Sequence, residues 1–300
     1  MRPVSMPRHD PDLAAPRAHA MRRYEIRPAR RALTPTGGFL KGFAYSLNPY
    51  IGCAFGAAGG CPFCYVRALP VAGATPGGWG AAVAAKSNLP ELLEKELFAL
   101  KRAGKLAETA IFMSSATDPY QGIERRARLT RGALEIIARF PIRRLVVQTR
   151  SPLVERDIDL LAAIGARAIA SITLETDDER VRRAFTPTSP SVARRLATLQ
   201  RLRSAGIPTQ AAIAPMLPND PERFAALIDA AADRAIVDTL FDGDGAGGRR
   251  SRALGMERMF ARLGYAEWFR PGAERELLAA LTRRLGPERV LFSQSGFNAI

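Results

Sequence analysis

The chain has few residues that bind metals or form disulfides. Its 300 residues include two histidines, His9 and His19, and three cysteines. All three cysteines, Cys53, Cys61 and Cys64, lie within one window of twelve residues. Because three thiols cannot all pair within one chain, the count argues against a framework of intramolecular disulfides. Clustered free thiols are typical of a reducing compartment, so we expect a cytoplasmic protein.

The sequence also lacks the signals of a membrane or secreted protein. It contains no apolar run of about 18 residues, the length that a membrane-spanning helix needs. The segment Met1–Arg8 has no apolar stretch of signal-peptide length. Hydrophobic residues nevertheless make up 47% of the chain, which is enough to bury a sizeable core. We therefore expect a globular protein without membrane association.

Acidic residues are scarce relative to basic ones. The chain has 44 Lys and Arg residues against 29 Asp and Glu, which gives a formal charge of +15 and a pI near 10.7. A charge of this sign favours an anionic partner such as DNA or RNA. The alternative is an arginine-rich composition with solvated helix faces, because pairs such as Arg125-Arg126 and Arg143-Arg144 are spread along the chain.

The three cysteines share a glycine-rich loop that suits a metal centre, because glycines let the backbone wrap a metal closely. Soft thiolates select zinc, copper(I) or iron–sulfur clusters. A structural zinc site normally has four protein ligands, and the two histidines lie in a polar N-terminal arm. Three thiolates on a four-iron cluster leave one iron open for chemistry. The alternatives are a small zinc knuckle and three unrelated thiols.

The stretch Cys61-Pro62-Phe63-Cys64, which follows an expected strand, resembles the radical S-adenosylmethionine (SAM) superfamily. The resemblance implies that Cys53, Cys61 and Cys64 hold a [4Fe–4S] cluster whose open iron binds SAM. One electron, from a reductant such as flavodoxin or ferredoxin, would then cleave SAM to a 5′-deoxyadenosyl radical. The usual spacing has three residues between the first two cysteines, whereas seven residues, 54–60, separate them here.

Four further motifs make the resemblance narrower. Residues 46–53, 64–67, 116–121 and 149–152 are similar to the spore photoproduct lyase-like branch, often labelled DNA repair photolyase. The resemblance covers about 31–240 and implies an enzyme of the lyase or radical-modification class with a nucleic-acid substrate. Enzymes that repair the spore photoproduct use a cysteine near the second strand, but 113–116 contains none. This departure argues against that repair reaction.

Short apolar strands alternate with amphipathic helices in units of about 30 residues. The strands are expected at 45–51, 111–113, 145–147, 168–174, 209–215 and 235–241, and the helices at 88–101, 130–139, 153–164, 192–205 and 221–232. Repeated strand–helix units indicate parallel strands with right-handed crossovers. This α/β pattern fits the open, partial (βα)6 TIM-like barrel, with helices outside, that the resemblance implies.

Composition divides the chain into three parts. Residues 1–30 are rich in Pro, Arg and Ala without periodicity, which is typical of a disordered or loosely packed arm. The radical SAM barrel is expected at 31–241. Residues 242–300 should form a basic, glycine-rich, mobile loop and a C-terminal helical extension. Arg249, Arg250 and Arg252 of that loop are candidates for closing over a phosphate backbone.

Polar residues follow the expected strands at one end of the sheet, where βα barrels carry their catalytic groups. The resemblance assigns SAM contacts among them. They are Ser115, Thr117 and Asp118 for the SAM amino group, Arg150 for its carboxylate, and Ser171, Thr173 and Glu175, which share one face of the fourth strand, for ribose or carboxylate. Phe63 and Tyr65 would pack near the cluster and adenine or in the core. Tyr120 is a candidate catalytic radical relay.

Three functions remain open from the sequence. The first is a radical SAM enzyme that acts on a nucleic acid, and the second is a radical SAM enzyme that modifies a peptide or small metabolite. The third is a basic nucleic-acid-binding protein whose cluster is structural or redox-sensing. The polar strand ends argue against the third function, because a binding module needs no SAM pocket.

Overall fold

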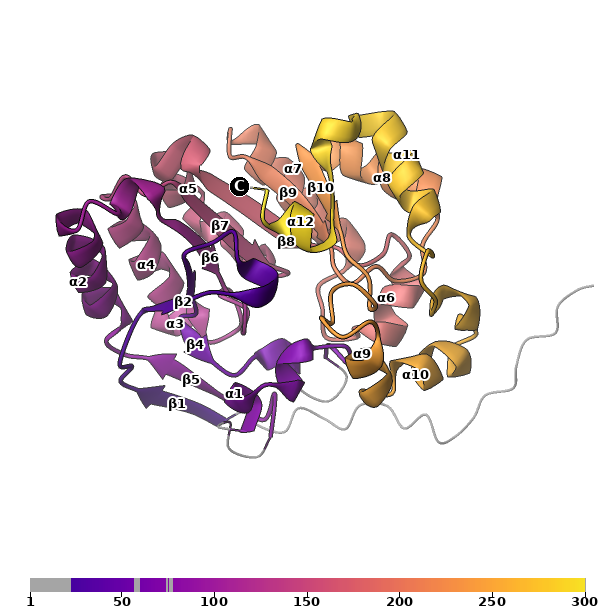
Figure 1. Ribbon diagram of the computed structural model, residues 1–300, viewed down its shortest axis with the longest axis horizontal. Helices are drawn as coiled ribbons and strands as arrows, with labels where there is room; N and C mark the ends of the chain where they lie inside the picture. The colour runs from indigo at the N-terminus through magenta and orange to yellow at the C-terminus, as the bar shows by residue number, and fades with distance from the viewer. Residues whose placement is uncertain (1–22, 57–59, 74, 76–77, 300) are drawn as a thin grey trace, which may run out of the picture.

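An eight-stranded sheet organises the protein, in the order β2-β3-β6-β7-β8-β9-β10-β11 (Figure 1). The computed structural model describes residues 23–56, 60–73, 75 and 78–299. Only β2 runs antiparallel to its neighbour, and the other neighbouring pairs are parallel. The strands are β2 (Leu33–Pro35), β3 (Tyr45–Leu47), β6 (Ala110–Met113), β7 (Arg144–Thr149), β8 (Ala168–Thr173), β9 (Thr209–Ile213), β10 (Arg234–Val237) and β11 (Val290–Phe292).

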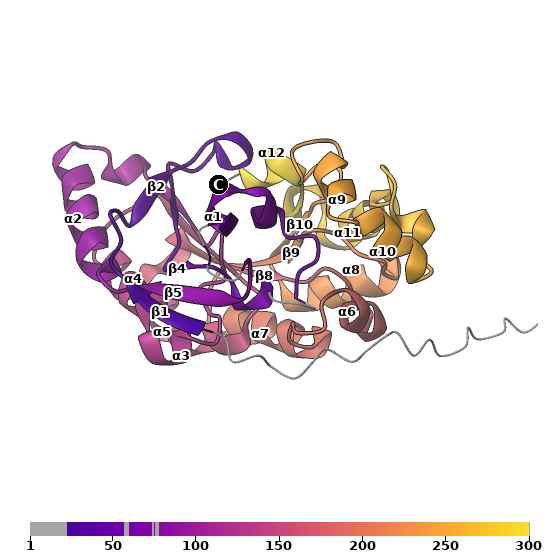
Figure 2. The ribbon, with the colours of Figure 1, turned by 90° about the horizontal axis from the view of Figure 1, so that it is seen from below.

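Helices cover the outer face of this sheet, and Figure 2 shows α4, α5, α7 and α8 along that side, with α1 and α12 on the other. The fold is therefore the α/β partial barrel that the sequence predicts. None of the helices in the described ranges is long and apolar enough to cross a lipid bilayer. The helices are α1 (Pro70–Gly73), α2 (Leu89–Arg102), α3 (Glu124–Ala127), α4 (Leu129–Ile137), α5 (Ile158–Ile164), α6 (Glu179–Phe185), α7 (Val192–Ser204), α8 (Pro221–Ala231), α9 (Arg249–Ala253), α10 (Met256–Arg262), α11 (Arg275–Leu285) and α12 (Ser293–Phe297).

The outer face of the sheet is apolar, whereas the inner face carries both apolar and polar side chains. Along β8, Ala170 and Ile172 join the large core between sheet and helices. Ile169 joins a smaller cluster inside the barrel. This inner cluster comprises Phe43, Ala110, Phe112, Val146, Ile169, Ala212, Ile236 and Phe297. It forms an apolar floor, and the polar residues at the strand ends lie above it.

The first predicted strand is in fact two strands. Residues 45–47 form β3 of the barrel, whereas β4 (Tyr50–Ile51) belongs to a separate sheet with β5 (Ala82–Lys86) and β1 (Arg23–Arg27). Pro49, which has no N–H to donate to a ladder, lies at the break. The chain therefore leaves the barrel sheet and joins the small sheet just before the cysteine loop.

Two of the predicted boundaries are wrong. Residues 23–27, assigned to a loosely packed arm, form β1 and pair in parallel with β5, while 1–22 lie outside the described residues. The segment 242–300 is not only helical, because β11 extends the barrel sheet beside β10. Its α11 packs on α8. The C-terminal segment is thus part of the barrel.

Candidate functional site

Three backbone hydrogen bonds within the cysteine loop fold it back on itself. The amide of Gly56 donates to the carbonyl of Cys53 (2.9 Å), that of Cys61 to Phe55 (2.8 Å), and that of Cys64 to Cys61 (3.1 Å). As a result all three cysteines line one cavity of about 700 Å³ at the carboxyl ends of the barrel strands. Ligand sites typically occupy about 300–1,000 Å³, so the cavity has room for a cofactor and part of a substrate.

Glycine is needed where the loop begins. Gly52 has a φ of +84°, and a Cβ there would collide with the backbone carbonyl of Ala82 on β5. A side chain would therefore push Cys53 away from the small sheet.

Polar side chains from the loop after β6 hold the cysteine loop in place. Thr117 donates its hydroxyl to the Gly52 carbonyl (2.6 Å). Gln121 is fully buried, accepts the amide of Ala54 (2.7 Å) and donates to Thr117 (2.9 Å). Asn48, which lies between β3 and β4, contacts the loop after β6, since its side chain accepts the amide of Ala116 (2.9 Å). Sequence reasoning gave Gln121 and Asn48 no role, although both lie in the quoted motifs.

Burial opposes ionisation of the three thiols. It raises the pKa of Cys61 to about 12 and also raises the pKa values of Cys53 and Cys64. Thiolates are the metal-binding form, so a cation must displace these protons. Arg150 carries a fixed positive charge near the thiols, and this charge acts to lower the pKa values of Cys61 and Cys64.

The donor set fits an iron–sulfur cluster. Soft thiolates are its usual ligands. Within the described ranges, no three His, Cys, Asp or Glu side chains are grouped as a single metal ion would require. Cysteines of a cluster bind different irons and need no such common centre.

Asp118 ties the ends of β6 and β7 together. One carboxylate oxygen accepts the hydroxyl of Thr149 (2.6 Å) and the amide of Tyr120 (2.9 Å), and the other accepts the amide of Arg150 (3.0 Å). Burial raises the pKa of Asp118 against these bonds. The residue lines the cavity, but its oxygens are already engaged.

Glu175 lies between two arginines. It contacts Arg150 (Nη1–Oε1, 3.0 Å) and Arg195 of α7 (Nη1–Oε2, 2.6 Å), and both Glu175 and Arg195 are essentially unexposed. Burial would raise the pKa of Glu175, but the two guanidinium groups hold it below its usual value. Glu175 does not line the cavity and instead holds Arg150 in it.

Arg150 keeps part of its guanidinium for a ligand. Its Nη1 also donates to Ser189 (3.2 Å), and its Cζ lies 5.7 Å from the ring centre of Phe55. In the described part of the chain, neither Nε nor Nη2 has a hydrogen-bond partner, and neither is a buried, unsatisfied atom. The Nε–Nη2 edge is the one that binds a carboxylate through two parallel bonds.

A row of hydrogen bonds crosses four strands inside the barrel, where Gln148, Ser171, Gln210 and Arg234 occupy one register row. Arg234 donates to Gln210 (2.8 Å), Gln210 to Ser171 (3.0 Å), and Ser171 to Gln148 (3.4 Å). An arginine can only donate, so the direction of the whole row is fixed. The amide N–H group of Gln148 is therefore left to donate into the cavity.

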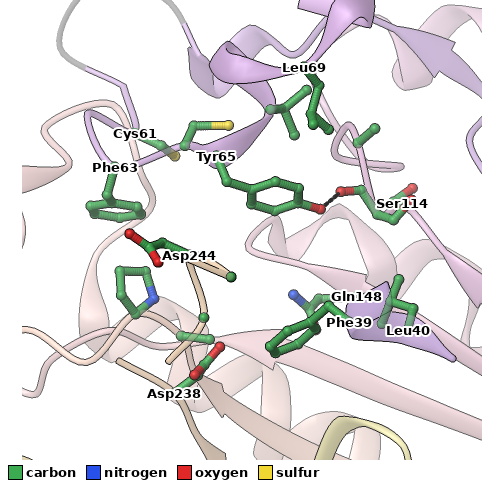
Figure 3. A pocket seen from close by; sticks show the side chains of 18 of the residues that line it. Phe39, Leu40, Cys61, Phe63, Tyr65, Leu69, Ser114, Gln148, Asp238 and Asp244 are labelled. Carbon is green, nitrogen blue, oxygen red and sulfur yellow. Dashed lines mark hydrogen bonds between the residues drawn. The ribbon is translucent and has the colours of Figure 1, made fainter. Parts of the chain in front are cut away.

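The cavity has a polar and aromatic end away from the cysteines (Figure 3). There Phe39, Leu40, Gln148 and Asp238 lie across from Cys61, Phe63 and Tyr65. Ser114 also lines the cavity and follows β6 directly, with a φ of +75°. Its buried hydroxyl has no partner among the described residues. Burial raises the pKa of Asp238 to about 7. Sequence reasoning did not single out Asp238.

The loop after β10 is more ordered than predicted. Residues 249–253 form α9, and the carboxylate of Asp244 accepts the amides of Ala246 (2.6 Å), Gly248 (3.1 Å) and Ser251 (3.1 Å). Arg250 donates to the Asp244 carbonyl (2.9 Å). Arg252 stacks on two aromatic rings, those of Phe241 and Phe269. That Arg249, Arg250 and Arg252 close over a phosphate backbone stays a prediction, and these contacts fix part of the loop in one conformation.

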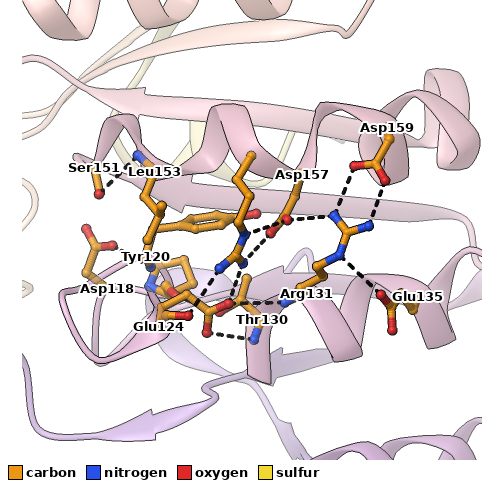
Figure 4. A network of polar contacts seen from close by, with 12 residues as sticks. Asp118, Tyr120, Glu124, Thr130, Arg131, Glu135, Ser151, Leu153, Asp157 and Asp159 are labelled. Atoms are coloured by element: carbon orange, nitrogen blue, oxygen red, sulfur yellow. Dashed lines mark hydrogen bonds and ion pairs between the residues drawn. The ribbon is translucent and has the colours of Figure 1, made fainter. Parts of the chain in front are cut away.

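Tyr120 lies away from the cavity. It is 1% exposed, packs in the core between sheet and helices, and is not among the residues that line the cavity. Figure 4 places it beside Glu124 and Asp157. Arg156 pairs with both carboxylates and lies 6.0 Å from the centre of the Tyr120 ring. Burial and the nearby Asp157 raise the pKa of Tyr120. This position does not fit the predicted radical relay.

The structure brings most of the predicted site residues together. The cavity is lined by Cys53, Cys61, Phe63, Cys64, Tyr65, Ser115, Thr117, Asp118, Arg150 and Thr173. Tyr65 is fixed there because its hydroxyl donates to the carbonyl of Ser115. Ser171, Glu175 and Tyr120 lie behind this lining, and the first two act through Gln148 and Arg150. Their burial at the correct strand end was predictable, but their partners were not.

Comparison with known proteins gives one family and one fold. The family model described as the radical SAM superfamily matches residues 47–231. An uncharacterized protein of Methanocaldococcus jannaschii is 31% identical over 191 residues, which are 64% of this chain and 66% of the relative. One from Mycobacterium tuberculosis is 29% identical over 180 residues, or 59% and 50% of the two chains. This chain thus spans about half to two thirds of the length of these curated relatives.

Solved structures of spore photoproduct lyase share the fold. One, complexed with dinucleoside spore photoproduct, has a TM-score of 0.64 and 15% identity, over 90% of this chain and 82% of that one. Another, a substituted lyase with bound AdoMet and the same dinucleoside, has a TM-score of 0.62 and 15% identity, over 90% and 81%. At such identities the similarity establishes the architecture.

Proposed function

Since the chain belongs to the radical SAM superfamily, whose members are enzymes that use a [4Fe–4S] cluster and SAM, we propose that it modifies a nucleic-acid substrate by radical chemistry. The observation that carries the proposal is the convergence of Cys53, Cys61 and Cys64 on one cavity at the strand ends. When bound, the cluster and SAM supply a 5′-deoxyadenosyl radical. The chain's own residues hold these groups, exclude water and orient the substrate.

Cys53, Cys61 and Cys64 are the proposed cluster ligands. Gln121 and Thr117 hold the backbone around Gly52 and Ala54, so they set where the first thiol stands. Phe63 packs against a core cluster beside the cavity and would shield the cluster from water. These supports explain how a longer loop than usual can still present three thiols to one place.

Arg150 is the proposed partner of the SAM carboxylate. Its Nη1 is held by Glu175 and Ser189, which leaves the Nε–Nη2 edge for a ligand. Ser115, Asp118 and Thr173 line the same region, while Thr117 and Asp118 mainly fix the loop geometry. Tyr65 would pack against the bound SAM.

The far end of the cavity is the proposed substrate end. Gln148 offers a fixed N–H donor, Ser114 a free hydroxyl, and Phe39 an aromatic wall. Asp238 lines this end and Asp244 lines the same cavity, and carboxylates there would repel a phosphate, so an uncharged part of the substrate belongs here. A nucleic acid would place a base at this end and its phosphates outside, where the +15 charge of the chain helps.

Two further points support a nucleic acid. The structurally similar spore photoproduct lyase has been solved with a dinucleoside ligand. Phe39, Phe63 and Tyr65 give the cavity aromatic surfaces on which bases can stack. The second candidate substrate is a peptide or small metabolite. The acidic side chains that line the cavity, Asp238 and Asp244, also favour such a substrate.

The decisive experiment is anaerobic reconstitution with iron and sulfide, followed by SAM and dithionite. We expect about four irons per chain and release of 5′-deoxyadenosine, with none from Cys61→Ser. Single-stranded DNA, duplex DNA, RNA and a peptide extract are then added separately. A nucleic acid that is altered and that accelerates SAM cleavage supports the proposal. Acceleration by peptides alone would favour the second candidate, and stoichiometric zinc would refute both.

Arg150 is tested in the same preparation. Arg150→Ala should keep its iron but bind SAM about tenfold to a hundredfold more weakly, because a charge-assisted bond contributes roughly 1.5–3 kcal/mol. Arg150→Lys should recover only part of the loss, since it lacks the two-bond edge. Arg139→Ala removes an exposed arginine paired with Glu94 and serves as the control. Unchanged SAM affinity in Arg150→Ala would remove this residue from the site.

A further inference from the structure

Trp79 lies beside the cysteine loop and lines the same cavity as the three thiols. It follows the glycine-rich stretch after α1, which sequence reasoning treated only as a loop. The indole nitrogen Nε1 is completely buried. A buried N–H without an acceptor is costly, so the position of this group needs a reason.

Cys64 lines the same cavity, and Trp79 is among the side chains that act to lower the pKa of its thiol. No acceptor among the described residues meets Nε1 at hydrogen-bond geometry. A neutral thiol is a weak acceptor, whereas hydrogen bonds to ionised acceptors are shorter and stronger. Metal binding would therefore turn Cys64 into a strong acceptor for this unpartnered N–H.

Gly56 makes room for this arrangement. A Cβ at this position would collide with Trp79 Nε1 and come within 2.7 Å of its Cδ1. The backbone at Gly56 is not in the left-handed region that favours glycine. The space taken by the indole, rather than the conformation of the chain, therefore accounts for a glycine here.

We propose that Trp79 donates its indole N–H to the Cys64 thiolate of the bound cluster and raises the cluster's reduction potential. A donor near sulfur stabilises the reduced cluster, which carries one more negative charge, more than the oxidised cluster. Trp79 is thus a positioning residue that tunes the acceptance of one electron. The inference rests on the proposed role of Cys64 as a ligand.

The test measures the midpoint potential of the reconstituted cluster by a dye-mediated redox titration read by EPR. Trp79→Phe keeps an aromatic ring but loses the N–H. We expect its ratio of reduced to oxidised cluster to fall about tenfold at a fixed potential, a shift of 59 mV to lower potential for a one-electron couple. Trp79→His, which retains a ring N–H, should recover part of the shift. Trp268→Phe, in the other tryptophan of the chain, should leave the potential unchanged.

Gly56→Ala gives an independent check, because the added methyl group displaces the indole. It should lower the potential in the same direction as Trp79→Phe. If both changes act through one hydrogen bond, the double variant should shift no further than the larger single variant. Additive shifts would mean that Gly56→Ala distorts the loop by another route, and they would count against the proposal.

The outcomes separate this inference from the proposed function. An unchanged potential in Trp79→Phe, with iron content equal to that of the parent protein, overturns the donor role. If Trp79→Phe cannot retain a cluster, retention by Trp79→His supports the donor, and loss in both indicates packing alone and contradicts it. Cys64→Ser tests the ligand separately. Normal cluster content in that variant would refute the cysteine assignment itself, whatever Trp79 does.

Discussion

Removal of the charge of Glu175 should destabilise the protein far more than removal of an exposed carboxylate. In Glu175→Gln the shape is kept, but Arg150 and Arg195 lose the anion between them. The side chain of Arg195 is 0% exposed, and its Nε and Nη2 already lack partners in the described residues. The variant would leave this guanidinium buried without a counter-charge.

The magnitude follows from that burial. Breaking a buried ion pair by removal of one partner costs roughly 3–5 kcal/mol. The matched control is Glu222→Gln, because Glu222 pairs with Arg283 and both side chains are 61% exposed. Such surface pairs contribute about 0–1 kcal/mol. The expected difference between the two variants is therefore at least about 2 kcal/mol.

Urea unfolding of the cluster-free protein, followed by circular dichroism under reducing and anaerobic conditions, measures both variants at equal slope. Addition of Arg195→Met to Glu175→Gln should restore part of the stability, since the unpaired buried cation is then gone. Equal unfolding free energies for Glu175→Gln and Glu222→Gln would refute the reasoning. A double variant less stable than Glu175→Gln would do the same.

Three more predictions follow from single positions. Asp238 has a folded pKa near 7 against an ordinary 3.8, so the folded state holds one extra proton between these values and loses stability as pH rises through them; Asp238→Asn should gain up to about 4 kcal/mol over the parent at pH 8 but little near pH 4, as urea midpoints will show. Tyr120→Phe should not change the rate of 5′-deoxyadenosine release, measured by chromatography, because Tyr120 does not line the cavity. Gly52→Ala should reduce iron retention on gel filtration because its Cβ meets the Ala82 carbonyl, whereas Gly286→Ala, at a similar φ of +83° but in open space, should not.

Much of the barrel was predictable because its strands are short apolar runs between amphipathic helices. The structure confirms all six expected parallel strands, although the first contributes only its residues 45–47. The strands that were missed have weaker signals. β11 has three residues, and β1 has five, of which Arg23, Glu25 and Arg27 are charged. Such segments become strands because a neighbouring edge is available, which periodicity within one segment cannot report.

The candidate site was predictable where composition is unusual and unpredictable where geometry decides. Three cysteines in one window identify themselves. Asp118 and Tyr120 lie two positions apart after β6, yet the first bonds the end of β7 and the second enters the core. Residue type and position after a strand do not determine the direction of a side chain in an irregular loop.

Several residues that hold the site in place lie outside the cavity lining. Substitutions at these residues should therefore affect the site although they do not line it. Arg150 faces the cavity, but Glu175 holds it, and Arg195 of α7 holds Glu175. Gln148 faces the cavity, but its amide is oriented through Ser171 and Gln210 by Arg234. Each of these two series of contacts ends in an arginine that does not line the cavity, Arg195 in the first and Arg234 in the second. This arginine fixes the geometry of its series because it can only donate hydrogen bonds. The chemistry at the strand ends therefore depends on residues of the barrel interior and of α7 that would never touch SAM or substrate.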